Sequence, residues 1–480
     1  MKLIVESRFA LLGLVMVALT ALFGVAFATR SAGTDAGALE RDPVAAQVES
    51  ALRVCPPPQG DDRVSDIGAF TLSAKEDEGT LIAEENTAAA APVGGKGEKT
   101  GRLWSTDVGE AERHTVVRAD GTLAAGLDVT QTTIGADDPY ATMVRCTEPG
   151  VSTWFAAPGG DDLEELRLLL ANVDDAAATV NVDLYATDGP AFSSDTRGIS
   201  VDAHGEAEVD LTELIESTGA VAVHVRTNAG RVASSLFAER TGAGSDWVPP
   251  TDRPAKKQVI AGVPKGKGVR RLIVATPGDE PATADVKVYT PDGEAELDGL
   301  EGLSVPPAAS ATLSLEGALG KEPGTVVVEA DRPVVVGVAM DRSSGEDTAY
   351  AATAPSLGSS AHNTAVLPGN PADTATELVF GALDGDATAV ITPVFADGEN
   401  GDPVKVEVPA GTTATQEMEN PGEPYALLVE VPDDSDPVYA GQVLTQGSGG
   451  GRATAAHPVM PALDQVALPP VSDTLTSVVP

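Results

Sequence analysis

A pattern of short apolar runs separated by turn residues occurs four times along this chain, and it limits the possible folds more than any other feature. The copy over residues 258–355 is the clearest. Its runs at 259–263, 272–275 and 284–289 are rich in Val and Ala, and the last one alternates with polar residues before Pro291-Asp292-Gly293. Such runs, bounded by Pro, Gly, Asp and Ser, are typical of β-strands and turns. About seven runs in about 100 residues predict a β-sandwich.

Three further stretches, at 53–149, 152–250 and 362–464, repeat this order of strands and turns. The first is the most divergent, because a polar, Ala-rich insertion stretches its middle around 75–100. A repeat of this length is too long for a propeller blade or a solenoid unit, so tandem domains are the simpler interpretation. The predicted fold class is all-β, with tandem immunoglobulin-like β-sandwich repeats behind an N-terminal transmembrane helix.

In two of the copies, two strands joined by a tight turn are expected near the end. In the clearest copy these strands are 326–329 and 334–339, and Asp331-Arg332-Pro333 is the expected turn. In the first copy, 114–117 and 123–127 are expected to form the corresponding hairpin. We divide the chain into an anchor or signal peptide, a tether, four sandwiches and a tail, at residues 1–30, 31–52, 53–150, 151–252, 253–358, 359–464 and 465–480.

The composition limits what this chain can bind. Hydrophobic residues make up 42% of it and aromatic residues 4%, so the cores must be built from Val, Leu and Ala. The formal net charge is −41, whereas nucleic acid and anionic lipid both need a basic partner surface. We therefore expect no nucleic-acid partner and a well-solvated exterior.

The N-terminal segment predicts export. Lys2 and Arg8 precede residues 9–28, which carry no charge. About 20 apolar residues span a bilayer, and positive flanking charge orients this end to the cytoplasm. A cleavable signal peptide ending at Ala26-Phe27-Ala28 is the competing interpretation. Both place the rest of the chain outside the cytoplasm, and a short amphipathic helix is expected within 44–54.

The two cysteines, Cys55 and Cys146, lie at the edges of the first copy. An even number of cysteines in an oxidising compartment predicts a disulfide. A loop of about 90 residues closed in this way would contribute roughly 4 kcal/mol. A catalytic thiol is the less favoured alternative.

One basic cluster interrupts the acidic pattern at the junction of the second and third copies. It is a candidate anion-binding patch, for a polymer or for a neighbouring acidic domain, and an exposed linker is the alternative. Its members are Arg253, Lys256, Lys257, Lys265, Lys267, Arg270 and Arg271.

No motif indicates catalysis, a resident metal or another cofactor. The five histidines follow no metal-ligand spacing, and the Gly-rich run 447–451 is better explained by a hairpin turn than by phosphate binding. Acidic groups near 161–165, 397–402 and 433–436 lack the EF-hand spacing. Glycoside hydrolysis by a pair of carboxylates stays an open alternative. Sugar-cleaving clefts usually need aromatic platforms, however, and the chain has only three tryptophans, Trp104, Trp154 and Trp247, of which packing explains the last two. The expectation is a protein that is not an enzyme.

A resemblance to a known family rests on a few short motifs. They are the Cys55-Pro56 opening, Cys146, the Trp154-Phe155 start and the turns at Asp188-Gly189 and Asp292-Gly293. The chain resembles an uncharacterised family of actinobacterial membrane-anchored or secreted proteins. The resemblance implies a location and an architecture, and it supplies no catalytic residue.

The predicted function is that of a non-catalytic structural or interaction protein of the cell envelope, outside the cytoplasm and tethered by the N-terminal helix. The alternative is a secreted or anchored module that binds cell-wall glycan. The expected partners are an envelope protein, possible wall polysaccharide and the membrane.

Overall fold

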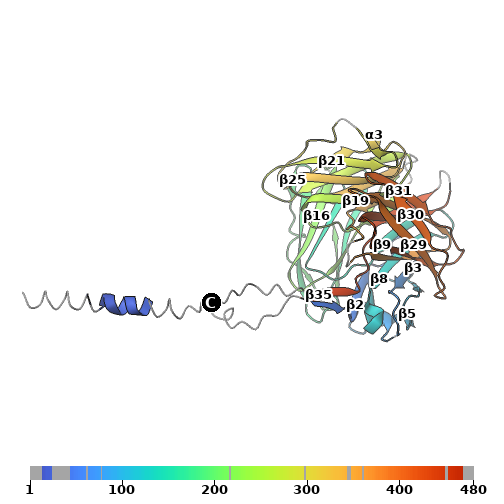
Figure 1. Ribbon diagram of the computed structural model, residues 1–480, viewed down its shortest axis with the longest axis horizontal. Helices are drawn as coiled ribbons and strands as arrows, with labels where there is room; N and C mark the ends of the chain where they lie inside the picture. Colours follow the sequence, from blue (N-terminus) through green and yellow to red (C-terminus); the bar gives the residue numbers. More distant parts are fainter. Residues whose placement is uncertain are drawn as a thin grey trace, which may run out of the picture. The chain divides into compact units, whose positions relative to one another are not determined.

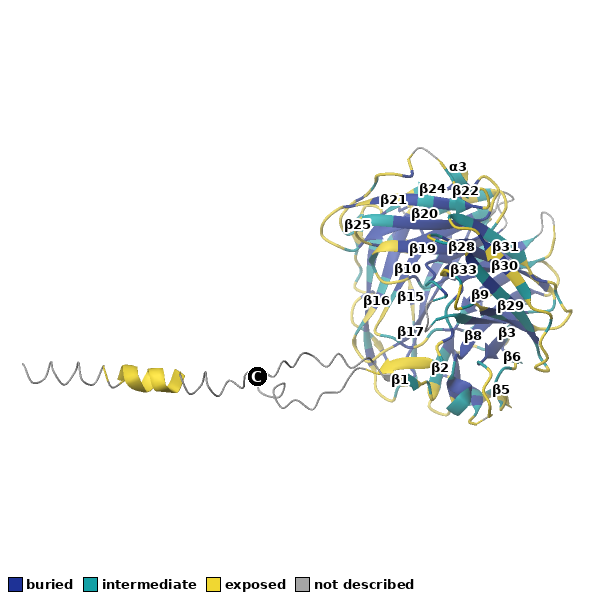
Figure 2. Cartoon of the chain, viewed as in Figure 1, coloured by how far each residue is buried: buried dark blue, intermediate teal, exposed yellow. Residues whose placement is uncertain are grey.

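The computed structural model has an all-β fold, which confirms the predicted class (Figure 1). It describes residues 13, 15–23, 44–60, 63–76, 78–215, 218–296, 299–342, 347–358, 362–448 and 452–468. The chain divides into two compact units, residues 47–465 and residues 1–46 with 466–480. Within the larger unit most strands are buried and the connecting loops are exposed (Figure 2).

The larger unit consists of four consecutive β-sandwiches. Sandwich 1 contains a 3₁₀ turn and eight strands, β2 (Ser50–Cys55), β3 (Arg63–Phe70), β4 (Leu81–Glu85), β5 (Pro92–Gly97), β6 (Trp104–Asp107), β7 (Thr115–Asp120), η1 (Gly121–Ala124), β8 (Asp128–Gly135) and β9 (Ala141–Arg145). Sandwich 2 contains β10 (Ser152–Pro158), β11 (Leu163–Ala171), β12 (Ala178–Ala186), β13 (Gly189–Ala191), β14 (Ile199–Val201), β15 (Glu206–Asp210), α2 (Thr212–Ile215), β16 (Ala220–Ala229), β17 (Ala233–Arg240) and β18 (Gly244–Val248).

Sandwiches 3 and 4 repeat this succession. Sandwich 3 contains β19 (Ala255–Val263), β20 (Gly268–Thr276), β21 (Ala282–Thr290), β22 (Gly293–Glu294), β23 (Leu303–Val305), β24 (Ala309–Ser314), α3 (Glu316–Leu319), β25 (Gly324–Arg342) and β26 (Thr348–Ala352). Sandwich 4 contains β27 (Thr364–Asn370), β28 (Thr374–Ala382), β29 (Ala387–Phe395), β30 (Val404–Val408), β31 (Thr412–Glu417), β32 (Tyr425–Glu430), β33 (Val438–Gln446) and β34 (Ala453–Pro458).

The four sandwiches share one strand order, which sandwiches 1 and 4 show most simply. One sheet has the order β2-β7-β4-β5 and the other the order β6-β3-β8-β9, and β27-β32-β29-β30 and β31-β28-β33-β34 are their counterparts. In immunoglobulin domains the first strand pairs with the second and the last strand pairs with the sixth. Here the first strand pairs with the sixth, and the seventh pairs with the second. The immunoglobulin-like part of the prediction is therefore not confirmed.

The two hairpins predicted at 114–127 and 326–339 are wrong. In sandwich 1, β7 and β8 lie in different sheets, and residues 121–124 form a 3₁₀ turn instead of a strand. In sandwich 3 the two predicted strands are one strand, β25, which pairs with β19 and β21 in its first part and with β20 and β26 in its second part. Pro333 lacks an N–H for the ladder but tolerates extended backbone, so the chain crosses between the sheets without turning back. The hairpin predicted around 447–451 is confirmed, because β33 pairs with β34.

Contacts between the sandwiches form a closed circuit within the larger unit. Leu52 and Val54 of β2 pack against Ala171 and Ala233 of sandwich 2. The corresponding first strands continue the pattern: β10 packs on β25, β19 on β33, and β27 on β3 and β8 of sandwich 1. The last strands of the four sandwiches also contact one another in succession, in the order β9, β18, β26, β34 and again β9.

Close backbone approach makes these contacts possible. Gly262 of sandwich 3 and Gly441 of sandwich 4 lie against each other, so a Cβ on Gly441 would overlap the backbone of Gly262. A Cβ on Gly337 would come within 2.8 Å of the Ala156 Cβ at the junction of sandwiches 2 and 3. These glycines are therefore needed for steric reasons, because no side chain fits between the strands.

β1 (Val44–Gln47) and β35 (Gln465–Leu468) form a two-stranded sheet, most of whose residues belong to the smaller unit and which includes the start of the predicted tail. Residues 44–47 and 50–55 are strands, so the amphipathic helix expected within 44–54 is wrong. The period-two alternation of Leu52 and Val54, whose side chains pack together, explains this result. Residues 15–23 are helical, but no helix among the described residues is long and apolar enough to span a membrane. Half of the predicted anchor, residues 9–28, lies outside the described residues.

Candidate functional site

The seven cations of the predicted anion-binding patch fall into separate groups. Arg253, Lys256 and Lys257 lie at the start of β19, whereas Lys265 and Lys267 follow its end. A strand rises about 3.3 Å per residue, so the nine residues of β19 hold the two groups roughly 30 Å apart. The structure therefore does not bring the seven side chains together.

Three of these cations have structural partners. The Lys265 ammonium lies 2.7 Å from the Glu377 carboxylate of sandwich 4, and the Lys257 ammonium lies 3.7 Å from Glu329. Arg270 is buried, and its guanidinium donates hydrogen bonds of 2.6 Å to the carbonyls of Gly266 and Gly320. Burial lowers the pKa of Arg270. Arg271 is half-buried on β20.

Lys265, Lys267 and Arg270 line one hollow of about 130 Å³ beside β26 and β34. Asp341 and Asp347 line it as well, so carboxylates accompany the cations. This mixture of charges, together with the engaged Lys265 and Arg270, gives little support for strong anion binding. Anion binding by the predicted patch stays a prediction.

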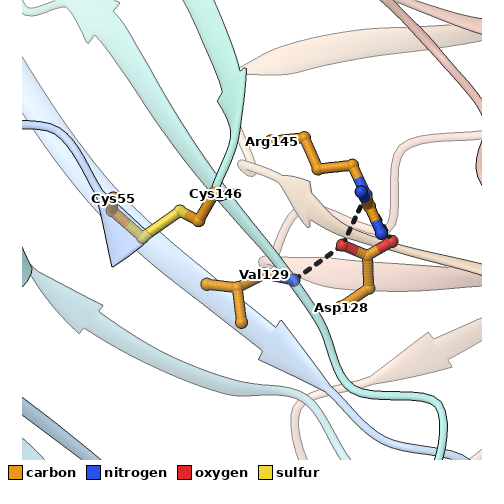
Figure 3. Close-up of a disulfide and its surroundings, with 5 residues drawn as sticks. All are labelled: Cys55, Asp128, Val129, Arg145 and Cys146. Atoms are coloured by element: carbon orange, nitrogen blue, oxygen red, sulfur yellow. Dashed lines mark hydrogen bonds and ion pairs between the residues drawn. A yellow bond between two sulfur atoms is a disulfide. The ribbon is translucent and has the colours of Figure 1, made fainter. Parts of the chain in front are cut away.

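The disulfide between Cys55 and Cys146 is confirmed, with Cα atoms 4.4 Å apart (Figure 3). It joins β2 to the segment after β9, where Val54 also bridges Thr147. The adjacent Arg145 forms an ion pair of 2.9 Å with the buried Asp128, whose carboxylate also accepts the Val129 N–H. The disulfide and this pair fix the end of sandwich 1.

A second group of polar and aromatic side chains lies on the sheet of β10, β16 and β12 in sandwich 2. Trp154, His224 and Asp183 are direct neighbours across these three strands. The Trp154 and His224 rings stack with centroids 3.8 Å apart, and the Tyr185 ring lies 5.8 Å from Trp154. We call this surface the Trp154 face, comprising Ser152, Trp154, Asp183, Tyr185, Phe192, Arg197, His224 and Arg226.

Two arginines complete the Trp154 face. Arg226 and Arg197 lie 2.6 Å and 2.5 Å from the Asp183 carboxylate. Burial alone would raise the pKa of Asp183, but these hydrogen bonds outweigh it and the pKa is lowered. The Arg197 guanidinium also lies 6.0 Å from the ring centroid of Phe192, which is 72% exposed. The face thus presents an apolar ring beside partly exposed guanidinium groups.

The Trp154 face contains a serine, a histidine and an aspartate that lie next to one another, Ser152, His224 and Asp183. The Ser152 Oγ lies 2.9 Å from His224 Nε2, as in a nucleophilic triad, but His224 Nδ1 lies 4.0 Å from the Asp183 carboxylate. A triad needs a hydrogen bond at this second position, and Asp183 is instead engaged by two arginines. Burial lowers the pKa of His224 to about 4, which weakens it as a base at neutral pH. The arrangement is better suited to holding a ligand than to transferring a proton.

The sequence interpretation missed this face because it assigned Trp154 to a core strand and His224 to a structural role. Trp154 is 7% exposed, but its neighbour Phe155 is the residue that enters the core of sandwich 2. The alternation in 179–185, which places Asp183 and Tyr185 on one side, was the available signal. Trp247 does pack at a junction, against Val144 and Leu169.

The acidic loops near 161–165, 397–402 and 433–436 are the candidate cation sites in the sequence. Asp162 pairs with Arg240, which is 5% exposed and also binds Asp341 at 2.7 Å. In the part of the chain that the structure describes, no group of three or more His, Cys, Asp or Glu residues is arranged to hold a metal ion.

The fold and the site together define a multi-sandwich, disulfide-containing β-protein. A family model covers residues 104–419, from β6 of sandwich 1 to just beyond β31 of sandwich 4, and the chain belongs to this family of unknown function (DUF5719). This agrees with the predicted membership of an uncharacterised family. No curated protein matches the sequence.

Among solved structures, a Streptomyces avermitilis alpha-L-rhamnosidase complexed with L-rhamnose is similar at 10% identity. The match covers 82% of this chain and 57% of that one, so the chain corresponds to little more than half of the enzyme. The TM-score is 0.14, and a similarity at this level carries no argument about fold or function.

Proposed function

We propose that this protein is a non-catalytic binding scaffold that acts outside the cytoplasm, at the cell envelope. The observation that carries the proposal is the closed circuit of four sandwiches, whose first sandwich is held by the Cys55–Cys146 disulfide. Disulfides persist in oxidising compartments, which favours a place outside the cytoplasm. The sandwiches would act as immunoglobulin-like domains do, by presenting loops and strand edges to partners.

The circuit supports a scaffold because it holds several surfaces in a fixed arrangement. Neighbouring sandwiches contact each other through their first strands and through their last strands, which lie in different sheets, so both sheets of a sandwich help to fix its position in the circuit. An N-terminal membrane anchor, or secretion after cleavage of a signal peptide, would place this body at the envelope. A protein partner at the envelope is the first expectation.

The test is a cross-linked pull-down of the intact protein from its own membranes, with the N-terminus of the mature chain sequenced in the same sample. Specific enrichment of one envelope protein, with a chain that starts at Met1, would support a tethered scaffold. Enrichment of wall polymer without protein, from a chain that starts near Thr29, would overturn the tether and the protein partner.

A second candidate function is the binding of an envelope polysaccharide at the Trp154 face. The exposed Phe192 ring favours it, because aromatic side chains commonly line ligand sites. Arg197 and Arg226 pair with Asp183 but are 38% and 44% exposed, so their further N–H groups could donate to a ligand. Phe192→Ser should weaken retention on immobilised polysaccharide about tenfold, whereas Val64→Ser, at an exposed position of sandwich 1, should not. Equal retention of the two variants would exclude this face.

A further inference from the structure

A small, partly open cavity at the junction of sandwiches 1, 2 and 4 contains an unusual combination of side chains. It has a volume of about 70 Å³, and its lining includes Met143, Trp247, His457 and Met460. Two of the six methionines of the chain therefore line one cavity together with one of its five histidines. Met143 comes from β9, while His457 and Met460 come from β34 and the segment after it.

The hydrogen bonding of His457 is that of a metal-binding histidine. The Nδ1 atom of His457 lies 2.9 Å from the Pro458 carbonyl oxygen, which can only accept a hydrogen bond, so Nδ1 carries the proton. The lone pair is then on Nε2, which has no hydrogen-bond partner among the described residues although the side chain is only 3% exposed. Metal-binding histidines commonly donate their other ring N–H to a backbone carbonyl in this way. Burial also lowers the pKa of His457, which keeps the imidazole neutral.

We infer that this cavity binds a single soft monovalent metal ion, Cu(I) or its analogue Ag(I), through His457 Nε2 and the thioether sulfurs of Met143 and Met460. Thioether and imidazole ligands select Cu(I), whereas Ca²⁺ and Mg²⁺ require oxygen ligands. Thioethers supply most of the donors of this site, so it differs from the usual clusters of His, Cys, Asp and Glu, none of which occurs in the described part of the chain.

The surroundings of the cavity are compatible with one added positive charge. Arg145 also lines the cavity, but its charge is compensated by the ion pair with Asp128. Val144, Trp247 and three prolines make most of the remaining wall apolar, and Thr147 is its polar member. An apolar shell of this kind limits the access of water to a bound ion. Both cysteines of the chain form the disulfide, so no thiolate competes for the ion.

The test is titration of the full chain with Ag(I), and with Cu(I) under anaerobic conditions against a chromophoric Cu(I) chelator. We expect one ion per chain at this site, a rise in Tm, and a shift of the His457 Nε2 nitrogen resonance. The double variant Met143→Leu/Met460→Leu should keep the fold, because Leu and Met have similar volumes. It should weaken binding about 100-fold or more and abolish the shift of the resonance.

Met418→Leu is the matched control, because Met418 is buried in the core of sandwich 4, away from the cavity. It should leave the affinity and the His457 resonance unchanged. The proposal is overturned if added ion does not shift the His457 Nε2 resonance of the wild-type chain. It is also overturned if the double variant binds the ion as tightly as the Met418→Leu control.

Discussion

At the scale of single residues, His224 shows how burial controls protonation on the Trp154 face. Its pKa is lowered from 6.5 to about 4, mainly by burial, so the folded protein favours the neutral imidazole. The resulting stability is present above pH 6.5 and is lost as the pH falls towards 4. His224→Phe keeps a ring on Trp154 but binds no proton. We expect the Tm of this variant to fall less than that of the wild type between pH 6.5 and pH 4.

Thermal denaturation in this pH range checks the prediction. Ser152→Ala is the control, because it removes the hydroxyl bonded to His224 and keeps the imidazole. If His224→Phe and the wild type lose stability in parallel, the titration of His224 does not contribute.

Asp246 is a buried carboxyl group with the opposite pH dependence. It is fully buried, and burial holds its pKa well above the usual range although its Oδ1 accepts the Trp247 N–H at 2.8 Å. An acid with a raised pKa stabilises the fold below its unfolded pKa of about 3.8, and this contribution is lost as the pH rises through the folded pKa. The Asp246→Asn variant has no carboxyl group to ionise at this position, so it does not lose this contribution to stability as the pH rises. Its Tm should therefore rise relative to the wild type between pH 4 and pH 8, and a constant difference over this range would contradict the prediction.

At the scale of elements, the disulfide joins the first strand of sandwich 1, β2, to the residue that follows its last strand, β9. It closes a loop of 91 residues, and the loss of such a link typically costs about 2–5 kcal/mol of unfolding free energy. We expect Cys55→Ala/Cys146→Ala to lower the urea midpoint by a corresponding amount. The wild type under reducing conditions should match the variant, and an unchanged midpoint would show that the circuit of sandwiches alone fixes this end.

The sequence indicates individual strands well but their partners poorly. The runs at 259–263 and 284–289 correspond to β19 and β21, because alternation reports which side of a strand is buried. It does not report which strands pair, so it predicts hairpins between neighbours in sequence. It also predicts a turn at Pro333 for this reason, although β25 continues through this residue.

The candidate sites show the same contrast between what the local sequence predicts and what depends on contacts between distant segments. The two cysteines were predictable because few alternatives exist for an isolated pair in an exported chain. The seven cations are close in sequence, but the extended strand β19 separates them. Trp154, Asp183 and His224 meet only through strand register, and Met143 meets His457 and Met460 only through contacts between sandwiches. Neither arrangement can be read from local pattern.

At the scale of the whole larger unit, closure of the circuit depends on contacts between segments far apart in sequence. The Gln446 side chain accepts the N–H groups of Gly135 and Tyr140, each at 3.0 Å, and so links sandwich 4 to sandwich 1. Interfaces at both sides of each sandwich should make unfolding cooperative, because loosening one junction weakens the circuit as a whole.

Gly441→Ala tests this coupling at the junction of sandwiches 3 and 4. The new methyl group would overlap the backbone of Gly262, which cannot move aside as a flexible side chain does, so we expect a loss of about 2–4 kcal/mol. Gly219→Ala is the control, because a Cβ there meets nothing within 4 Å. Hydrogen exchange should show faster opening in β19 and β33 and also in β8 of sandwich 1, since the circuit joins them. If only β19 and β33 lose protection, the sandwiches unfold independently and the contacts between them do not form a cooperative whole.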